Sequence, residues 1–244
     1  MKKMVIVGLV MILATLVVSS PAMAAIEVEG DAYVGVYDKY LWRGFDLSGS
    51  MPVAQGGVDL TSGNYTLSYW TNVQLSSDSG EGLKSGEATE NDFILDYSRD
   101  LNDLVSITVG DIYYMLDGID DTHELYFTVD LSTILEPSVS VYYDWDEADE
   151  NGLYYTVSIG HSFDLMEELS LSLGALVGYN DKSDYAVGNY SDWHNYELSV
   201  GADYALTDQI SISPSFLFSE GLSDDAKKVI ESEMMAGVAV TFTF

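Results

Sequence analysis

The sequence contains no cysteine among its 244 residues. Without a thiol the chain can form neither structural nor redox-active disulfides, and no cysteine is available to carry a lipid anchor. Histidine is also scarce, with three residues scattered along the chain. This composition gives no ligand spacing typical of a transition-metal site, so we expect neither a metal ligand set nor a cofactor.

Basic residues are few as well: 9 Lys+Arg stand against 40 Asp+Glu. Lys2 and Lys3 belong to a predicted leader, and removing them leaves 7 basic residues and a formal charge near −33. A nucleic-acid-binding protein needs a basic footprint, so nucleic acid is excluded as a partner. High charge with few aromatic residues is typical of disorder, but 18 Tyr, 8 Phe and 4 Trp indicate a folded chain.

Long apolar runs are confined to the start of the chain. Lys2 and Lys3 precede an apolar stretch at 5–18, and residues 22–24 have the small-x-small pattern of a cleavage site. We therefore predict a signal peptide at 1–24 and one domain at 25–244. The apolar stretch is shorter than the ~20 residues of a membrane-spanning helix. An exported chain without such a helix is periplasmic, secreted or a closed β-barrel.

Alternating segments fill the rest of the sequence. The last one has an apolar residue at every second position from Met234 to Phe244, with mostly small or polar residues between them. A period of two predicts a strand with two different faces. Twelve such segments are predicted, and their apolar sets extend over residues 28–42, 54–60, 65–75, 93–97, 105–115, 125–131, 139–145, 153–163, 169–179, 196–204, 210–218 and 234–244.

Two further patterns favour a membrane barrel over a soluble sandwich. Short turns follow the even-numbered segments, whereas longer acidic loops, notably 76–89, 181–192 and 220–232, follow the odd-numbered ones. Aromatic residues collect at strand ends, as interfacial girdles require: Tyr40, Trp42, Tyr143, Trp145, Tyr179, Tyr196, Tyr204, Phe242 and Phe244. We predict an all-β, up-and-down antiparallel barrel of 12 strands in the bacterial outer membrane, surrounded by lipid and lipopolysaccharide.

One part of the sequence resembles a known family. Residues 40–49 (YLWRGFDLSG), 52–59 (PVAQGGVD) and the pair Tyr69-Trp70 resemble the opening strands of the TorF family of bacterial porins. The resemblance implies an outer-membrane barrel with a channel role and no identified substrate. Phe242 and Phe244 are similar to the C-terminal aromatic signal of such barrels, which implies recognition by the outer-membrane insertion machinery.

If the apolar residues face lipid, the residues between them face a lumen. The predicted lumen residues are Lys39, Arg43, Gln55, Asp59, Trp70, Asn72, Asp92, Asp96, Glu124, Tyr126, Asp130, Tyr142, Glu197 and Asp203. An acidic lumen raises the local cation concentration, so we predict a narrow porin-like channel for small solutes that prefers cations. A closed barrel, filled by side chains and acting as an adhesin, receptor or structural protein, remains the alternative.

Four charged residues leave their roles open. Arg43 and Lys39 are either constriction charges or structural ion pairs, and the ion pair is favoured because an unpaired buried charge is costly. Asp38 and Asp111 would face lipid in a strict alternation. Either they lie near an interface or a β-bulge, for which Gly110 is a candidate, reverses their facing; we favour bulges.

An enzyme is the third alternative, and we predict that the protein is not one. His161 and Ser162 are adjacent, so in a strand they point to opposite faces and cannot form a dyad. His123 and His194 lie near predicted strand ends, where isolated histidines are usually incidental. The acidic run at 144–150 offers oxygen ligands for Ca²⁺ or Mg²⁺, but its spacing favours solvated surface charge. The sequence indicates neither the solute nor an oligomeric state.

Overall fold

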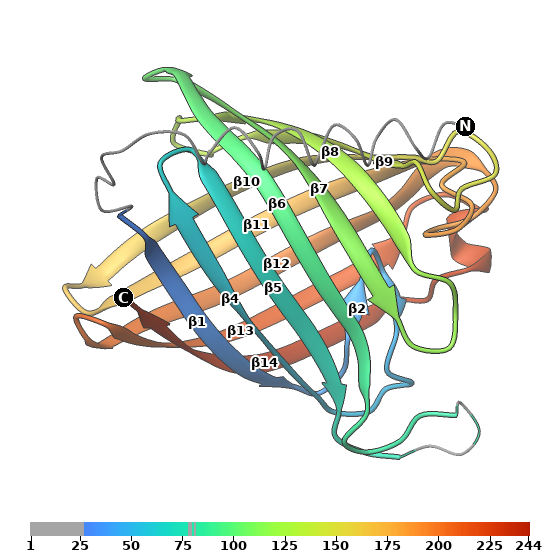
Figure 1. The fold of residues 1–244 in the computed structure, drawn as a ribbon, viewed down its shortest axis with the longest axis horizontal. Helices are drawn as coiled ribbons and strands as arrows, with labels where there is room; N and C mark the ends of the chain where they lie inside the picture. Colours follow the sequence, from blue (N-terminus) through green and yellow to red (C-terminus); the bar gives the residue numbers. More distant parts are fainter. Residues whose placement is uncertain (1–26, 78–79, 81) are drawn as a thin grey trace, which may run out of the picture.

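The computed structural model describes residues 27–77, 80 and 82–244, so the predicted signal peptide lies outside the described residues. Each barrel strand pairs with its neighbours in the chain, and β1 pairs with β14 to close the barrel (Figure 1). This confirms the predicted all-β barrel of 12 antiparallel strands. The strands are β1 (Glu29–Tyr37), β4 (Val53–Ser62), β5 (Tyr65–Gln74), β6 (Ala88–Asn102), β7 (Val105–Leu116), β8 (Thr122–Leu131), β9 (Ser138–Asp144), β10 (Leu153–Met166), β11 (Leu169–Asp181), β12 (Ser191–Thr207), β13 (Ile210–Gly221) and β14 (Glu233–Thr243).

Three further elements lie in connections. Strands β2 (Leu41–Trp42) and β3 (Phe45–Asp46) pair with each other inside the connection from β1 to β4, and η1 (Ala226–Lys228) is a short 3₁₀ turn before β14. Among the described residues, no helix is long and apolar enough to cross a bilayer.

The outer wall carries the apolar half of the alternation. Val34, Leu95 and Val157 are examples, each about half exposed, and every one alternates with a less exposed neighbour. Large apolar side chains exposed on every barrel strand form a continuous hydrophobic surface. This surface is far more extensive than the apolar surface that a soluble monomer exposes. Such a surface suits hydrocarbon rather than water.

The two ends of the barrel differ. One end, the turn end, has the short connections predicted from the sequence, at 63–64, 103–104, 132–137, 167–168 and 208–209. The other end, the loop end, has connections at 38–52, 75–87, 117–121, 145–152, 182–190 and 222–232, of which only 117–121 is short. The fully buried side chains, such as Gln74, Glu124, Tyr154 and His194, lie where the strands approach the loop end. The packed core therefore fills one end of the barrel.

The connection at 38–52, here called the inserted loop, accounts for this core. The first strand was predicted to continue to Trp42, with Tyr40 and Trp42 on the outer wall, and this prediction is wrong. Strand β1 ends at Tyr37, and Tyr40 is buried against Trp70 of β5, with ring centroids 5.5 Å apart. Trp42 packs against Tyr114 of β7 at 6.1 Å. These contacts with inward-facing strand residues place the inserted loop inside the barrel.

Asp111 faces outward, and the bulge favoured for it is absent. The pairing of β7 with β6 and β8 continues without a shift at this position, so Asp111 lies opposite Leu95 and Leu125. Its carboxylate is hydrogen-bonded to His123 Nδ1 at 2.8 Å and accepts a bond from Trp145 Nε1 at 3.0 Å. Asp111 was expected to turn inward through a bulge, but it stays on the outer wall, where His123 and Trp145 satisfy its carboxylate.

Two other residues that do not suit a regular strand, Asp38 and Pro214, are accommodated by their immediate surroundings. Asp38 follows β1 at the loop end, and its carboxylate accepts a hydrogen bond from the Ala236 N–H at 2.9 Å. Pro214 pairs with Val238 of β14, but the pairing of β13 with β12 is interrupted beside it. The interruption suits a residue that has no N–H to donate.

Several inward tyrosines lie over inward glycines of the neighbouring strand. A Cβ added to Gly237 would lie 2.1 Å from Cδ1 of Tyr37, and one added to Gly110 would lie 2.6 Å from Cε1 of Tyr126. The glycines are therefore required by the rings that cover them. This packing joins β1 to β14 at the seam where the barrel closes.

Replacement of Gly237 by valine tests this packing. We expect Gly237→Val to lower the free energy of unfolding by about 1–3 kcal/mol, because the new side chain overlaps the Tyr37 ring. The double variant Gly237→Val/Tyr37→Ala should recover part of that loss. The measurement is the temperature at which the folded band disappears on heat-modifiable gels. Equal midpoints for wild type and Gly237→Val would show that the ring does not need the glycine.

Candidate functional site in the barrel lumen

A tight turn between β2 and β3 shapes the tip of the inserted loop. Arg43 and Gly44 both have positive φ, at 47° and 83°. A Cβ on Gly44 would lie 2.8 Å from Cδ1 of Ile230, so glycine is needed for the backbone conformation and for the close approach. The turn projects the Arg43 side chain across the lumen.

Arg43 forms a buried ion pair with the far wall. Its two terminal nitrogens donate to both carboxylate oxygens of Glu124 in β8, at 2.8 and 2.7 Å, and the two side chains are 8% and 1% exposed. The guanidinium carbon lies 4.3 Å from the ring centroids of Trp42 and Tyr154 and 5.0 Å from that of Tyr142. Burial opposes the charge, but Glu124 outweighs it and raises the pKa of Arg43, so the guanidinium stays charged.

His194 of β12 holds the same turn from the other side. Its Nε2 donates to the Arg43 carbonyl at 2.7 Å, its Nδ1 is bonded to the Tyr190 hydroxyl, and its ring stacks on Phe45. From the sequence alone, His194 was expected to be an incidental residue near a strand end. A shift in the pairing of β11 with β12 turns the consecutive residues His194 and Asn195 both inward, and alternation alone gives no signal for such a shift.

Lys39 and Asp46 fasten the base of the inserted loop. Lys39 Nζ lies 2.5 Å from a Glu233 carboxylate oxygen and 3.7 Å from Asp46. Asp46 accepts hydrogen bonds from the backbone N–H and hydroxyl groups of both Ser48 and Ser50, at 2.6 to 3.0 Å. Burial alone would raise the pKa of Asp46, but these hydrogen bonds outweigh burial and lower it.

Lys39 and Arg43 thus belong to the inserted loop and form structural ion pairs. The strand pairing places the other predicted lumen residues on the inner wall: Gln55, Asp59, Trp70, Asn72, Asp92, Asp96, Glu124, Tyr126, Asp130, Tyr142, Glu197 and Asp203. Some of them bond to each other across strands, as in the 3.2 Å bond from Gln55 to Asn72 and the 3.0 Å bond from Tyr126 to Asp96.

The inner wall has two unlike halves. Large and acidic side chains face inward from β5 to β9, including Trp70, Asp92 and Tyr126, whereas β10 to β13 present mostly serine and glycine. Four residues on this second half are exposed although they face inward: Ser172, Ser199, Asp203 and Ser215. The lumen beyond the inserted loop is therefore not filled by side chains at these positions.

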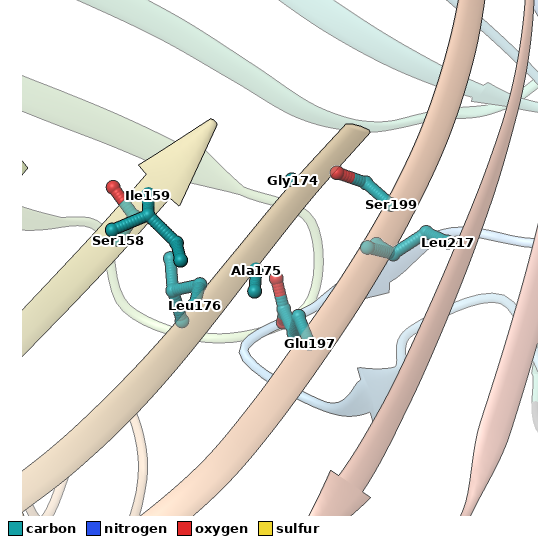
Figure 2. A pocket seen from close by; sticks show the side chains of 8 residues that line it. All are labelled: Ser158, Ile159, Gly174, Ala175, Leu176, Glu197, Ser199 and Leu217. Atoms are coloured by element: carbon teal, nitrogen blue, oxygen red, sulfur yellow. The ribbon is translucent and has the colours of Figure 1, made fainter. Parts of the chain in front are cut away.

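Two adjoining cavities lie against the serine- and glycine-rich half. The larger, of about 310 Å³, separates the inserted loop from the wall and is lined by Arg43, Tyr114, Tyr142 and Tyr154 among others. The smaller, of about 240 Å³, continues along β10 to β13 past Ser158, Gly174 and Ser199 (Figure 2). Both cavities are lined by Leu176, Glu197 and Leu217, so they form one hollow beside the loop.

Residues 22–242 match Gcw_chp, a family described as bacterial proteins of unknown function. The chain belongs to the Gcw_chp family. No curated protein matches the sequence. The resemblance to TorF porins stays a prediction.

Solved porin structures share the fold of this Gcw_chp protein at low sequence identity. The NanC porin is 12% identical, with a TM-score of 0.57 over 88% of this chain and all of that one. The COG4313 outer membrane channel from Pseudomonas putida F1 is 10% identical, with a TM-score of 0.55 over 93% of this chain and 100% of that one. The KdgM porin, in complex with disordered oligogalacturonate, is 10% identical, with a TM-score of 0.54 over 89% and 99%. Similarity at this level of identity shows that the barrel fold is shared, but it does not identify a solute for this protein.

Removal of one member of the buried ion pair tests whether it holds the inserted loop. Glu124→Leu leaves the Arg43 charge buried without its partner, so we expect a loss of about 3–5 kcal/mol in the free energy of unfolding. The double variant Arg43→Met/Glu124→Leu should recover most of it, because no uncompensated charge remains. Denaturant titration in detergent measures both. A double variant less stable than the single one would contradict this role.

The lowered pKa of Asp46 predicts how the inserted loop responds to acid. Its folded pKa lies below the ordinary value near 3.9, so its stabilising bonds are complete above about pH 4 and are lost as pH falls through the folded pKa. Relative to its cleavage of an unstructured peptide at the same pH, pepsin should therefore cleave residues 38–52 faster at about pH 2 than at about pH 4 in the wild type. Asp46→Asn should be cleaved readily at both pH values, and a variant with the wild-type pH dependence would refute the assignment.

Proposed function

We propose that the protein is an outer-membrane channel for passive diffusion of small solutes, with a preference for cations. The observation that carries the proposal is the hollow beside the inserted loop, which adjoins an inner wall where inward-facing serines are exposed. A barrel filled by its own side chains would bury these serines. The fold shared with the NanC and KdgM porins supports a channel.

The preference for cations follows from the charges on the inner wall. Asp59, Asp96, Asp130 and Asp203 face inward toward the turn end, whereas the basic groups at the loop end, Lys39 and Arg43, are already paired. Walls of one sign in a low-dielectric setting focus the potential and concentrate counter-ions. The lumen therefore favours cations over anions of equal size.

The outer wall supports the outer-membrane location. Its exposed apolar side chains extend around the barrel, and the rings of Phe242 and Phe244 stack at 5.8 Å at the turn end. The Phe244 backbone exchanges hydrogen bonds of 2.9 and 3.0 Å with Gly30, so Phe244 joins the closing seam. This placement supports Phe242 and Phe244 as an assembly signal read by the insertion machinery.

The second candidate function is a closed barrel that acts through its loops as an adhesin, receptor or structural element. The polar core at the loop end favours it, since Asn72, Glu124, Asn180 and His194 are almost completely buried there. A rim hydrolase has less support. Among the described contacts, His123 bonds to Asp111 on the outer wall and to no hydroxyl nucleophile.

Planar-bilayer recording separates the two candidates. We expect stepwise conductance in KCl and a reversal potential of the cation-preferring sign in a salt gradient. The preference should weaken as salt is raised, because the carboxylates are screened. Asp59→Asn/Asp203→Asn should shift the reversal potential toward zero, whereas Glu136→Gln, in a turn outside the lumen, should not.

Three outcomes are decisive. Absence of conductance from protein that shows heat-modifiable migration would favour the closed barrel. Anion preference would refute the electrostatic argument and leave the fold intact. Cation preference that survives the loss of both aspartates would place the selectivity elsewhere.

A further inference from the structure

The hollow beside the inserted loop has the character of a binding site. Figure 2 shows Glu197 between Leu176 and Leu217, near Ser199, on the inner faces of β11 to β13. We propose that this hollow binds small organic monocations, protonated amines with a short apolar chain, as they cross the lumen. The inference rests on the proposed channel function and adds to it a class of solute.

Glu197 supplies the charge of the site. One of its carboxylate oxygens accepts a hydrogen bond from Asn195 Nδ2 at 2.9 Å. Within the described part of the chain, no lysine or arginine nitrogen forms an ion pair with it. Arg43 lines the same hollow, but Glu124 neutralises it. A cation in the hollow therefore meets a carboxylate that is not engaged in an ion pair with a lysine or arginine of the described residues.

The rest of the lining selects against a bare inorganic ion. Leu41, Ile112, Leu176 and Leu217 contribute apolar surface around the carboxylate. A hydrated metal ion would leave this surface in contact with water, whereas an alkyl chain would cover it and gain from the burial of apolar area. The Thr156 hydroxyl lies in the same lining and can accept a hydrogen bond from an ammonium group.

The lining also argues against anions. Two of its hydroxyl groups are already engaged, since that of Tyr114 donates to Glu124 at 3.0 Å and that of Tyr154 donates to Asn195 at 2.8 Å. An anion would be repelled by Glu197, and Arg43, which lines the hollow, is stacked between aromatic rings and 8% exposed. A small amine fits the groups that remain available.

The test uses butylammonium as probe, with ammonium and butyrate as matched comparisons. In bilayers that carry a KCl current, butylammonium should reduce the current at a concentration at least tenfold lower than ammonium, and butyrate should have no effect. Glu197→Gln should raise the blocking concentration of butylammonium about tenfold. Glu168→Gln, which removes the same charge in an exposed turn at 167–168, is the control and should block like the wild type.

Isothermal titration calorimetry in detergent reads binding without any current, so it keeps the two proposals apart. Folded protein that conducts no KCl would refute the channel, and calorimetric binding of butylammonium that depends on Glu197 would still support the site. A channel that conducts KCl but is blocked equally by ammonium and butylammonium would overturn the site alone. Block that is unchanged in heat-modifiable Glu197→Gln protein would overturn it as well.

Discussion

The arrangement of the lumen depends on the buried ion pair between Arg43 and Glu124. A guanidinium that is 8% exposed is tolerated only because both oxygens of a fully buried carboxylate bind it and aromatic rings cover its faces. That pair joins the tip of the inserted loop to β8, while His194 joins the same turn to β12. The loop is therefore held against two separate parts of the barrel wall, and the hollow beside it follows from where it is held.

The same contact explains why the two halves of the barrel differ. On one side, tyrosines and carboxylates meet the inserted loop and pack around it. On the other, serine and glycine leave space between the loop and β10 to β13. A barrel of 12 strands is wide enough to hold one inserted segment and still leave a hollow, which an eight-stranded barrel filled by its side chains does not.

Alternation predicted most of the barrel from the sequence, because a period of two is imposed wherever one face meets lipid and the other does not. Alternation gave wrong predictions where the chain no longer lies in a wall with lipid on one face. Tyr40 and Trp42 continue the period of β1, yet the chain has already left the wall, and only the turn at Arg43 and Gly44 marks the departure. His194 was missed because a pairing shift turned two consecutive residues inward. Asp111 keeps its outward facing because His123 and Trp145, which come from other strands and loops, provide its partners.

The proposed cation-preferring passage beside the inserted loop can be tested directly, because the sequence contains no cysteine. Ser199→Cys places a single thiol on the inner wall of the hollow. In oriented proteoliposomes, with reagent supplied only on the loop side, the cationic reagent aminoethyl methanethiosulfonate should label this thiol faster than the anionic reagent sulfonatoethyl methanethiosulfonate. Equal labelling rates would contradict the cation preference, and no labelling by either reagent would show that the inserted loop closes the barrel.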